Sequence, residues 1–224
     1  MIVCSSCKVA VHLNCYGVQG DVMESWPCSR CKYKTDSEDS VKQACLLCPK
    51  KDGALKPVDV DGVESSGSVV QFAHLFCSLW MPEVYIEDLK KMEPIMNVKA
   101  IKGTRRKLLC KLCKLKCGAC VHCSHGTCRT AFHPICAREA RHRLEVWENC
   151  GSENVELWAF CSKQSEFPDV RGNPQFGDSF VARRSDSSTA NCIPSKLLTE
   201  KQNKLKAGLN GDEVAVHVEA GFYF

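Results

Sequence analysis

The sequence lacks the features that mark secreted and membrane proteins. Its N-terminus, MIVCSSCKVAVHLNC, has no basic segment followed by a long apolar run and a small-residue cleavage site. No stretch approaches the roughly 18 consecutive apolar residues that a transmembrane helix requires. We therefore expect an intracellular protein with no membrane contact, in a compartment where thiols stay reduced.

Apolar residues for a conventional core are also scarce. Hydrophobic residues make up 44% of the 224 residues, but 18 of these are cysteines, and about 36% remains without them. A core of this composition needs cross-links. Because reduced thiols do not form disulfides, the cysteines predict bound Zn²⁺. Three complete zinc-thiolate sites would also cancel the formal charge of +4, so net charge predicts no partner.

Cysteines and histidines recur as pairs whose members are separated by two residues. A short loop with this spacing supplies two of the four tetrahedral ligands of zinc. A single pair could equally be one face of a buried helix. A series with interleaved histidines favours metal sites, and it argues against a thiol oxidoreductase, which needs one exposed reactive pair. The pairs are Cys4/Cys7, His12/Cys15, Cys28/Cys31, Cys45/Cys48, His74/Cys77, Cys110/Cys113 and His133/Cys136.

The amino-acid sequence around these pairs resembles that of a known family. The segments AVHLNCYGV, HLFCSLWMPEV, DLKKMEPI, GACVHCSHGTCRTAFHPICA and FCSK are similar to a PHD finger, a zinc knuckle and an extended PHD finger in succession. This arrangement occurs in bromodomain-PHD finger scaffolds, Jade proteins and plant trithorax-like methyltransferases. The fold class it implies is a small zinc-stabilised α+β protein, with cross-brace PHD-type fingers and little regular secondary structure.

The resemblance implies a division into four regions. Residues 1–34 are expected to form a partial PHD finger, 42–95 the zinc knuckle region and 96–164 the extended PHD finger. Residues 165–224 are expected to be a largely disordered tail, because 165–193 are rich in Ser, Asp, Gly and Pro. Within the tail, KLLTEKQNKLKAGL could form a short polar helix and EVAVHV a strand.

The resemblance also implies how the ligands are shared. In a cross-brace the first and third pairs hold one zinc and the second and fourth hold the other. The knuckle closes a site of its own, and the first finger closes one and leaves His12 and Cys15 with half of another, so we expect its opening pair upstream of Met1. The three complete sites are Cys4, Cys7, Cys28, Cys31; Cys45, Cys48, His74, Cys77; and Cys110, Cys113, His133, Cys136.

The remaining site of the extended finger is one ligand short. Cys123, Cys128 and Cys161 belong to it by the resemblance, which expects histidine where the sequence has Gln164. An amide oxygen is neutral and harder than zinc prefers. Water, His122 or His125 could complete the tetrahedron instead. The sequence predicts a weakened, labile zinc at this position.

A basic segment at 99–116, KAIKGTRRKLLCKLCKLK, holds eight Lys or Arg and no acid. It predicts a phosphate-binding surface, and the alternative is a solvated face that offsets the zinc-thiolate charge. The candidate nucleic-acid contacts are Lys99, Lys102, Arg105, Arg106, Lys107 and Lys111.

The functional expectation is a nuclear chromatin reader that has no enzymatic activity and takes no small-molecule substrate. The resemblance implies binding of the histone H3 tail by the first finger and of nucleosomal DNA by the extended finger, in transcription regulation and within a chromatin-modifying complex. Before Tyr16 the first finger has no aromatic residue for a methyl-lysine cage. A ubiquitin ligase also uses a cross-brace, but the Trp before Cys28 and the knuckle favour PHD. The remaining alternative is a DNA-binding zinc-finger protein without histone recognition.

Overall fold

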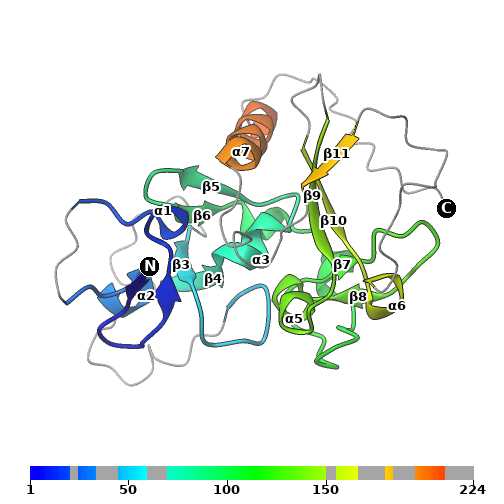
Figure 1. The fold of residues 1–224 in the computed structure, drawn as a ribbon, viewed down its shortest axis with the longest axis horizontal. Helices are drawn as coiled ribbons and strands as arrows, with labels where there is room; N and C mark the ends of the chain where they lie inside the picture. Colours follow the sequence, from blue (N-terminus) through cyan, green and yellow to red (C-terminus); the bar gives the residue numbers. More distant parts are fainter. Residues whose placement is uncertain are drawn as a thin grey trace.

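A computed structural model describes residues 1–20, 25–33, 45–59, 70–149, 155–165, 180–183 and 195–209. Most of the Ser- and Gly-rich segment 165–193 and all of the strand-like EVAVHV segment lie outside these residues. Among the helices described, none is long and apolar enough to cross a membrane. Regular elements are short, as expected from the scarcity of apolar residues, and they fall into two small fingers on either side of a central sheet (Figure 1).

The first finger contains two short strands and two single-turn helices. β1 (Ile2–Val3) pairs antiparallel with β2 (Ala10–Val11), and α1 (Leu13–Tyr16) and α2 (Ser29–Lys32) follow. α1 ends at Gly17, whose φ of 70° is the left-handed conformation that glycine adopts without strain.

The knuckle region supplies the central four-stranded sheet, in the order β4-β3-β6-β5. Its strands are β3 (Leu55–Val58), β4 (Gln71–His74), β5 (Tyr85–Asp88) and β6 (Glu93–Met96). β3 and β4 are antiparallel, whereas β3 runs parallel to β6. Helix α3 (Leu75–Leu79) begins directly after β4 and buries most of its residues, so part of the core lies between the two fingers.

The second finger begins with η2 (Val98–Ala100) and α4 (Gly103–Arg106), which carry the basic segment. β7 (Val121–His122) pairs with β8 (Ala131–Phe132). Helix α5 (Pro134–Glu139) starts with a proline, which fits the first turn of a helix, and the chain turns at Arg141, where φ is 55°. β9 (Leu144–Asn149) pairs with β10 (Val155–Ala159) and β11 (Phe180–Arg183), and α6 (Ser162–Ser165) follows β10.

A buried lysine links the first finger to the knuckle. The Lys56 side chain is 3% exposed, and its Nζ lies 3.0 Å from Glu93 Oε2 and 4.0 Å from the centre of the Tyr16 ring. The Tyr16 hydroxyl donates to Leu55 O at 2.7 Å. Burial lowers the pKa of Lys56 and raises that of Tyr16. Lys56 bonds to Glu93 and to Lys91 O within the knuckle, whereas the Tyr16 hydroxyl finds its acceptor, Leu55 O, only when the finger and the sheet are docked.

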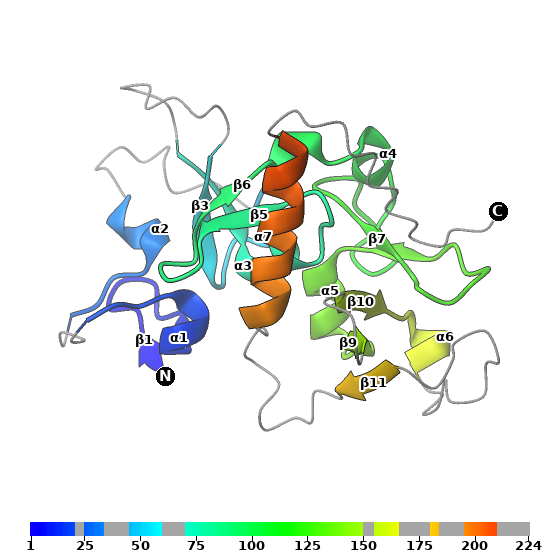
Figure 2. The ribbon, with the colours of Figure 1, turned by 90° about the horizontal axis from the view of Figure 1, so that it is seen from above.

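The tail contains a docked helix at the segment where the sequence allows a short polar helix, within a region otherwise expected to be largely disordered. α7 (Ser195–Leu209) lies across β5 (Figure 2). It buries Leu197 and Leu198, and Lys201 Nζ donates to the carbonyls of Ser78 and Leu79 at the end of α3. Burial of this amine lowers the pKa of Lys201 to about 7. The polar composition predicts a weak helix, but two buried leucines, Lys201 at the end of α3 and an ion pair of Lys206 with Glu87 at 2.7 Å attach it to the rest of the chain.

Replacement of Leu198 by Asp is expected to release α7 from β5. Leu198 is 8% exposed, so the change forfeits about 2 kcal/mol of apolar burial and places a charge against the sheet. Amide hydrogen exchange across 195–209 should accelerate in this variant. Asn203→Asp adds the same charge on the exposed face of the helix and should leave exchange unchanged. Equal protection in the two variants would show that the leucine does not hold the helix.

Candidate metal centres

Four groups of side chains bring their metal-capable atoms together, with the atoms of each group within 4.8 Å of one another. Three groups have four members and one has three. The groups coincide with those that the ligand order and the resemblance predict, including the interleaving of two sites in the second finger. They are Cys4, Cys7, Cys28, Cys31; Cys45, Cys48, His74, Cys77; Cys110, Cys113, His133, Cys136; and Cys123, Cys128, Cys161.

The four groups share one local construction. In each, the backbone N–H that opens the second half of the site donates to the sulfur of the first cysteine, at 3.2 to 3.4 Å. Such bonds stabilise a thiolate and orient it for a metal. The donor–acceptor pairs are Cys28 N to Cys4, His74 N to Cys45, His133 N to Cys110 and Cys161 N to Cys123.

The two histidines within complete groups are oriented as zinc ligands. His74 Nε2 lies 2.7 Å from Asp52 O, and His133 Nε2 lies 2.6 Å from Cys117 O. A ring that donates from Nε2 to a carbonyl leaves the Nδ1 lone pair for a metal. Nδ1 of His74 lies 3.3 Å from Cys48 Sγ, and Nδ1 of His133 lies 3.4 Å from Cys113 Sγ. The donor set therefore fits tetrahedral zinc.

Each group contains one thiol that ionises more readily than the others. Although burial opposes it, backbone hydrogen bonds lower the pKa of Cys4 to about 6. Hydrogen bonds from neighbouring backbone or side-chain groups also lower the pKa of three further thiols, although burial opposes the change: Cys45, Cys110 and Cys128. Burial raises the pKa of the partners Cys28, Cys77 and Cys136. All ligand thiols must lose their protons to bind zinc, so affinity is expected to fall as pH falls.

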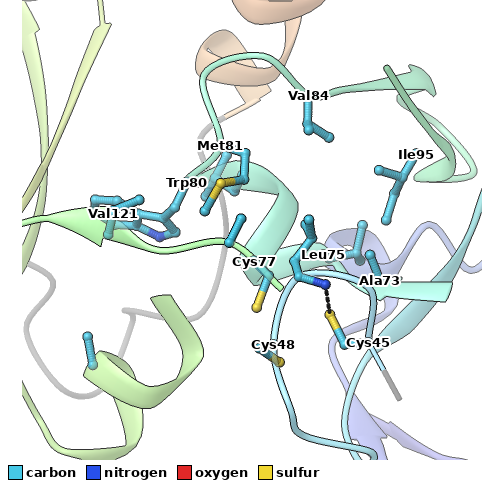
Figure 3. Packing of buried hydrophobic residues seen from close by; sticks show 14 of the residues in the cluster. Cys45, Cys48, Ala73, Leu75, Cys77, Trp80, Met81, Val84, Ile95 and Val121 are labelled. Atoms are coloured by element: carbon cyan, nitrogen blue, oxygen red, sulfur yellow. Dashed lines mark hydrogen bonds between the residues drawn. The ribbon is translucent and has the colours of Figure 1, made fainter. Parts of the chain in front are cut away.

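The central group is part of the packed core rather than a surface feature. Figure 3 shows Cys45, Cys48 and Cys77 beside Leu75, Trp80 and Met81, with the three sulfur atoms at one edge of the packed side chains. All four members of this group are buried. Loss of the metal would therefore leave three thiols and an imidazole inside the core without the ion that joins them. Metal binding is thus coupled to folding.

Two predicted ligands remain a pair. His12 Nδ1 lies 3.9 Å from Cys15 Sγ, but within the described residues the two join no group of three or more. Cys117 and Cys120 also stay outside every group. Cys120 is fully buried, and burial raises its pKa to about 12. Cys150 and Cys192 lie outside the described residues.

The basic segment divides into two kinds of side chain. Arg105 Nε pairs with Glu83 at 3.2 Å, and Arg106 Nη2 donates to Val98 O at 2.8 Å, so both arginines make contacts within the chain. The four lysines proposed as phosphate contacts are exposed: Lys99, Lys102, Lys107 and Lys111. Sequence reasoning missed the role of Arg105, because its partner Glu83 lies 22 residues away.

These observations define a compact zinc-finger protein with interleaved Cys/His sites. Residues 43–164 match the family model described as a PHD-zinc-finger like domain, and residues 1–32 match that of the PHD-finger. The chain belongs to the PHD zinc-finger family, and zinc is its cofactor. A crystal structure of zebrafish PHF14-PZP has the same fold, with a TM-score of 0.50 and 29% identity, over 74% of this chain and 80% of the other.

Longer curated proteins contain similar segments. Jade-1 of Xenopus laevis is 35% identical over 231 residues, which is 100% of this chain and 25% of the relative. The PHD finger protein rhinoceros of Drosophila melanogaster is 36% identical, over 74% of this chain and 5% of its own length. Histone-lysine N-methyltransferase TRX1 of Oryza sativa is 41% identical, over 64% of this chain and 13% of its own length. The chain thus spans at most about a quarter of these three relatives.

Proposed function

We propose that the chain is a zinc-stabilised chromatin reader of the nucleus, without enzymatic activity, which binds the histone H3 tail and nucleosomal DNA in transcription regulation. The observation that carries the proposal is the set of zinc-binding groups spread over two fingers and a knuckle, in a family whose relatives include a histone-lysine methyltransferase. A chromatin-modifying complex is the expected setting. The ligands assigned to zinc are the members of the four groups.

The first finger offers a strand edge to which a histone tail could pair. β1 is paired with β2 alone among the described strands, in a sheet of two strands. An edge strand offers N–H and C=O groups to an added peptide. Val3 on β1 is 54% exposed. The first finger can therefore accept an extended peptide as a third strand.

The start of the second finger offers a basic surface to which nucleosomal DNA could bind. Lys102 and Lys107 flank helix α4, and Lys111 follows it in the loop that carries Cys110. All three side chains are exposed, and the zinc group beside them holds the loop in place. Phosphate contacts by such lysines are independent of base sequence and weaken with salt.

Replacement of Lys102, Lys107 and Lys111 by Ala is expected to weaken nucleosome binding and reduce its salt dependence. If each lysine contacts one phosphate, the slope of log K against log salt should fall by roughly two to three units. Fluorescence anisotropy with labelled nucleosomes at several salt concentrations measures this slope. The matched control removes three exposed lysines of the first finger and knuckle, Lys8, Lys51 and Lys90, and should change the slope less.

The same assay separates histone recognition from DNA binding. Nucleosomes that lack the H3 tail should bind more weakly than intact nucleosomes, and the triple lysine variant should retain this difference. Equal affinity for both would support the alternative of a DNA-binding zinc-finger protein without histone recognition. An unchanged salt slope in the lysine variant would refute the DNA surface.

A further inference from the structure

The group formed by Cys123, Cys128 and Cys161 is built like the complete sites but has only three ligands. Cys161 N donates to Cys123 Sγ at 3.3 Å, which is the same bond that Cys28, His74 and His133 make in the other groups. In those groups, the residue three positions later supplies the fourth ligand: Cys31, Cys77 and Cys136. In this group that residue is Gln164.

The three cysteines are held firmly in place. Cys128 Sγ lies 3.9 Å from Cys161 Sγ and 3.3 Å from Thr130 Oγ1. The loop after Cys123 is anchored to β10, because Ser124 N donates to Ala159 O at 2.7 Å and Ser124 Oγ accepts from Ala159 N at 2.9 Å. Ser165 fixes the end of α6 through Arg143 N at 2.9 Å. The site is therefore preorganised even though one position lacks a ligand.

Neither neighbouring histidine joins the group. Within the described residues, His122 and His125 are absent from the set of metal-capable atoms that lie within 4.8 Å of one another. His122 belongs to β7 and directly precedes Cys123, and successive side chains of an extended chain point to opposite sides. His125 is exposed, and the anchoring of Ser124 limits the movement of its loop. The sequence alternatives for the fourth ligand are thus reduced to Gln164 and a ligand from solution.

The least buried member of the group is Cys128, and two exposed cations lie next to positions of the group in the chain. Cys123 and Cys161 are each 4% exposed, whereas Cys128 is half-buried and the preceding residues His125, Gly126 and Thr127 are exposed. Arg129 follows Cys128, and Lys163 precedes Gln164, and both are exposed. A small anionic ligand can therefore approach the metal from the Cys128 side.

We propose that this centre holds zinc through three thiolates and that its fourth position takes an external thiolate of a low-molecular-weight, acidic thiol. Zinc prefers sulfur to a neutral amide oxygen, and the two flanking cations favour a ligand that also carries carboxylates. On binding, the thiol releases its proton to solvent as its sulfur bonds to zinc, and the water at that position leaves. No electrons are transferred. The inference rests on the zinc binding of the family and not on chromatin recognition.

The probe is reduced glutathione, and the readout is the absorption of cobalt at this centre. A mild chelator should first remove one of the four zinc ions from the loaded chain, at least about tenfold faster than the others, because even changes around intact ligands alter metal affinity by roughly 10–100-fold. Cobalt then refills that centre. Glutathione should raise its thiolate-to-cobalt charge-transfer absorbance by about one third, since a fourth sulfur joins three.

Two variants of Gln164 make the test specific. Gln164→His supplies the missing ligand and should abolish both the fast release and the response to glutathione. Gln164→Ala removes the amide and should behave like the original chain. If the Ala variant alone responds, the amide is the fourth ligand and the proposal is wrong. It is also overturned if the original chain does not respond, if the His variant responds equally, or if all four ions leave together. None of these outcomes bears on nucleosome binding.

Discussion

Complete removal of zinc by a strong chelator is expected to unfold both fingers and the knuckle between them. Structural zinc supplies on the order of 10 kcal/mol per site, whereas a whole domain is stable by only about 5–15 kcal/mol. Many of the most deeply buried residues are themselves ligands, including Cys4, Cys77, Cys110 and His133. Without the metal these side chains lose the ion that joins them and leave polar groups in the core, so the remaining apolar contacts cannot hold the fold.

Far-UV circular dichroism and tryptophan fluorescence measure this loss, and added zinc under reducing conditions should reverse it. Single ligand replacements test the same link. His133→Ala opens a complete site and should lower the thermal midpoint strongly. His125→Ala removes an exposed histidine of the same finger that joins no group, and should leave the midpoint unchanged. Native spectra after full chelation would contradict a metal-dependent fold.

Gly118→Ala is expected to disrupt the junction between the knuckle and the second finger. A Cβ at this position would lie 2.3 Å from the Leu47 carbonyl carbon and 2.6 Å from Cys48 N, and φ is +61°. The clash is with backbone and no rotamer relieves it. Separation would break the bond from Ala119 N to Leu47 O and displace Cys48, which is a proposed ligand. We expect a loss of about 3 kcal/mol or more in the free energy of unfolding.

Denaturant unfolding of zinc-loaded protein measures this loss, with two comparisons. Gly103 begins helix α4, and a Cβ at this position would meet no atom within 4 Å. Gly103→Ala should therefore change the free energy of unfolding by no more than about 1 kcal/mol. Gly17→Ala is the counterpart at the other junction, where a Cβ would lie 2.3 Å from the Lys91 carbonyl carbon. It should loosen the first finger. If the Gly118→Ala and Gly103→Ala variants were equally stable, the junction between the knuckle and the second finger would not depend on the close approach of Gly118 to Leu47.

The sequence by itself determined the ligand groups and the class of fold. Spacing of two residues can be recognised without coordinates because it is a local property of a turn. The resemblance then ordered the pairs into a cross-brace, and the structure brings the same side chains together. The deficit at Gln164 was visible for the same reason, since it lies at a known offset from Cys161.

Only the tertiary structure decided what depends on residues distant in the chain. Arg105 and Arg106 share a basic run with exposed lysines, but Glu83 and Val98 O engage the two arginines. The polar tail contains a helix that docks because β5 and the end of α3 present complementary partners to Leu198 and Lys201. Such contacts are set by how the fingers and the sheet pack, and neither residue spacing nor composition encodes that packing.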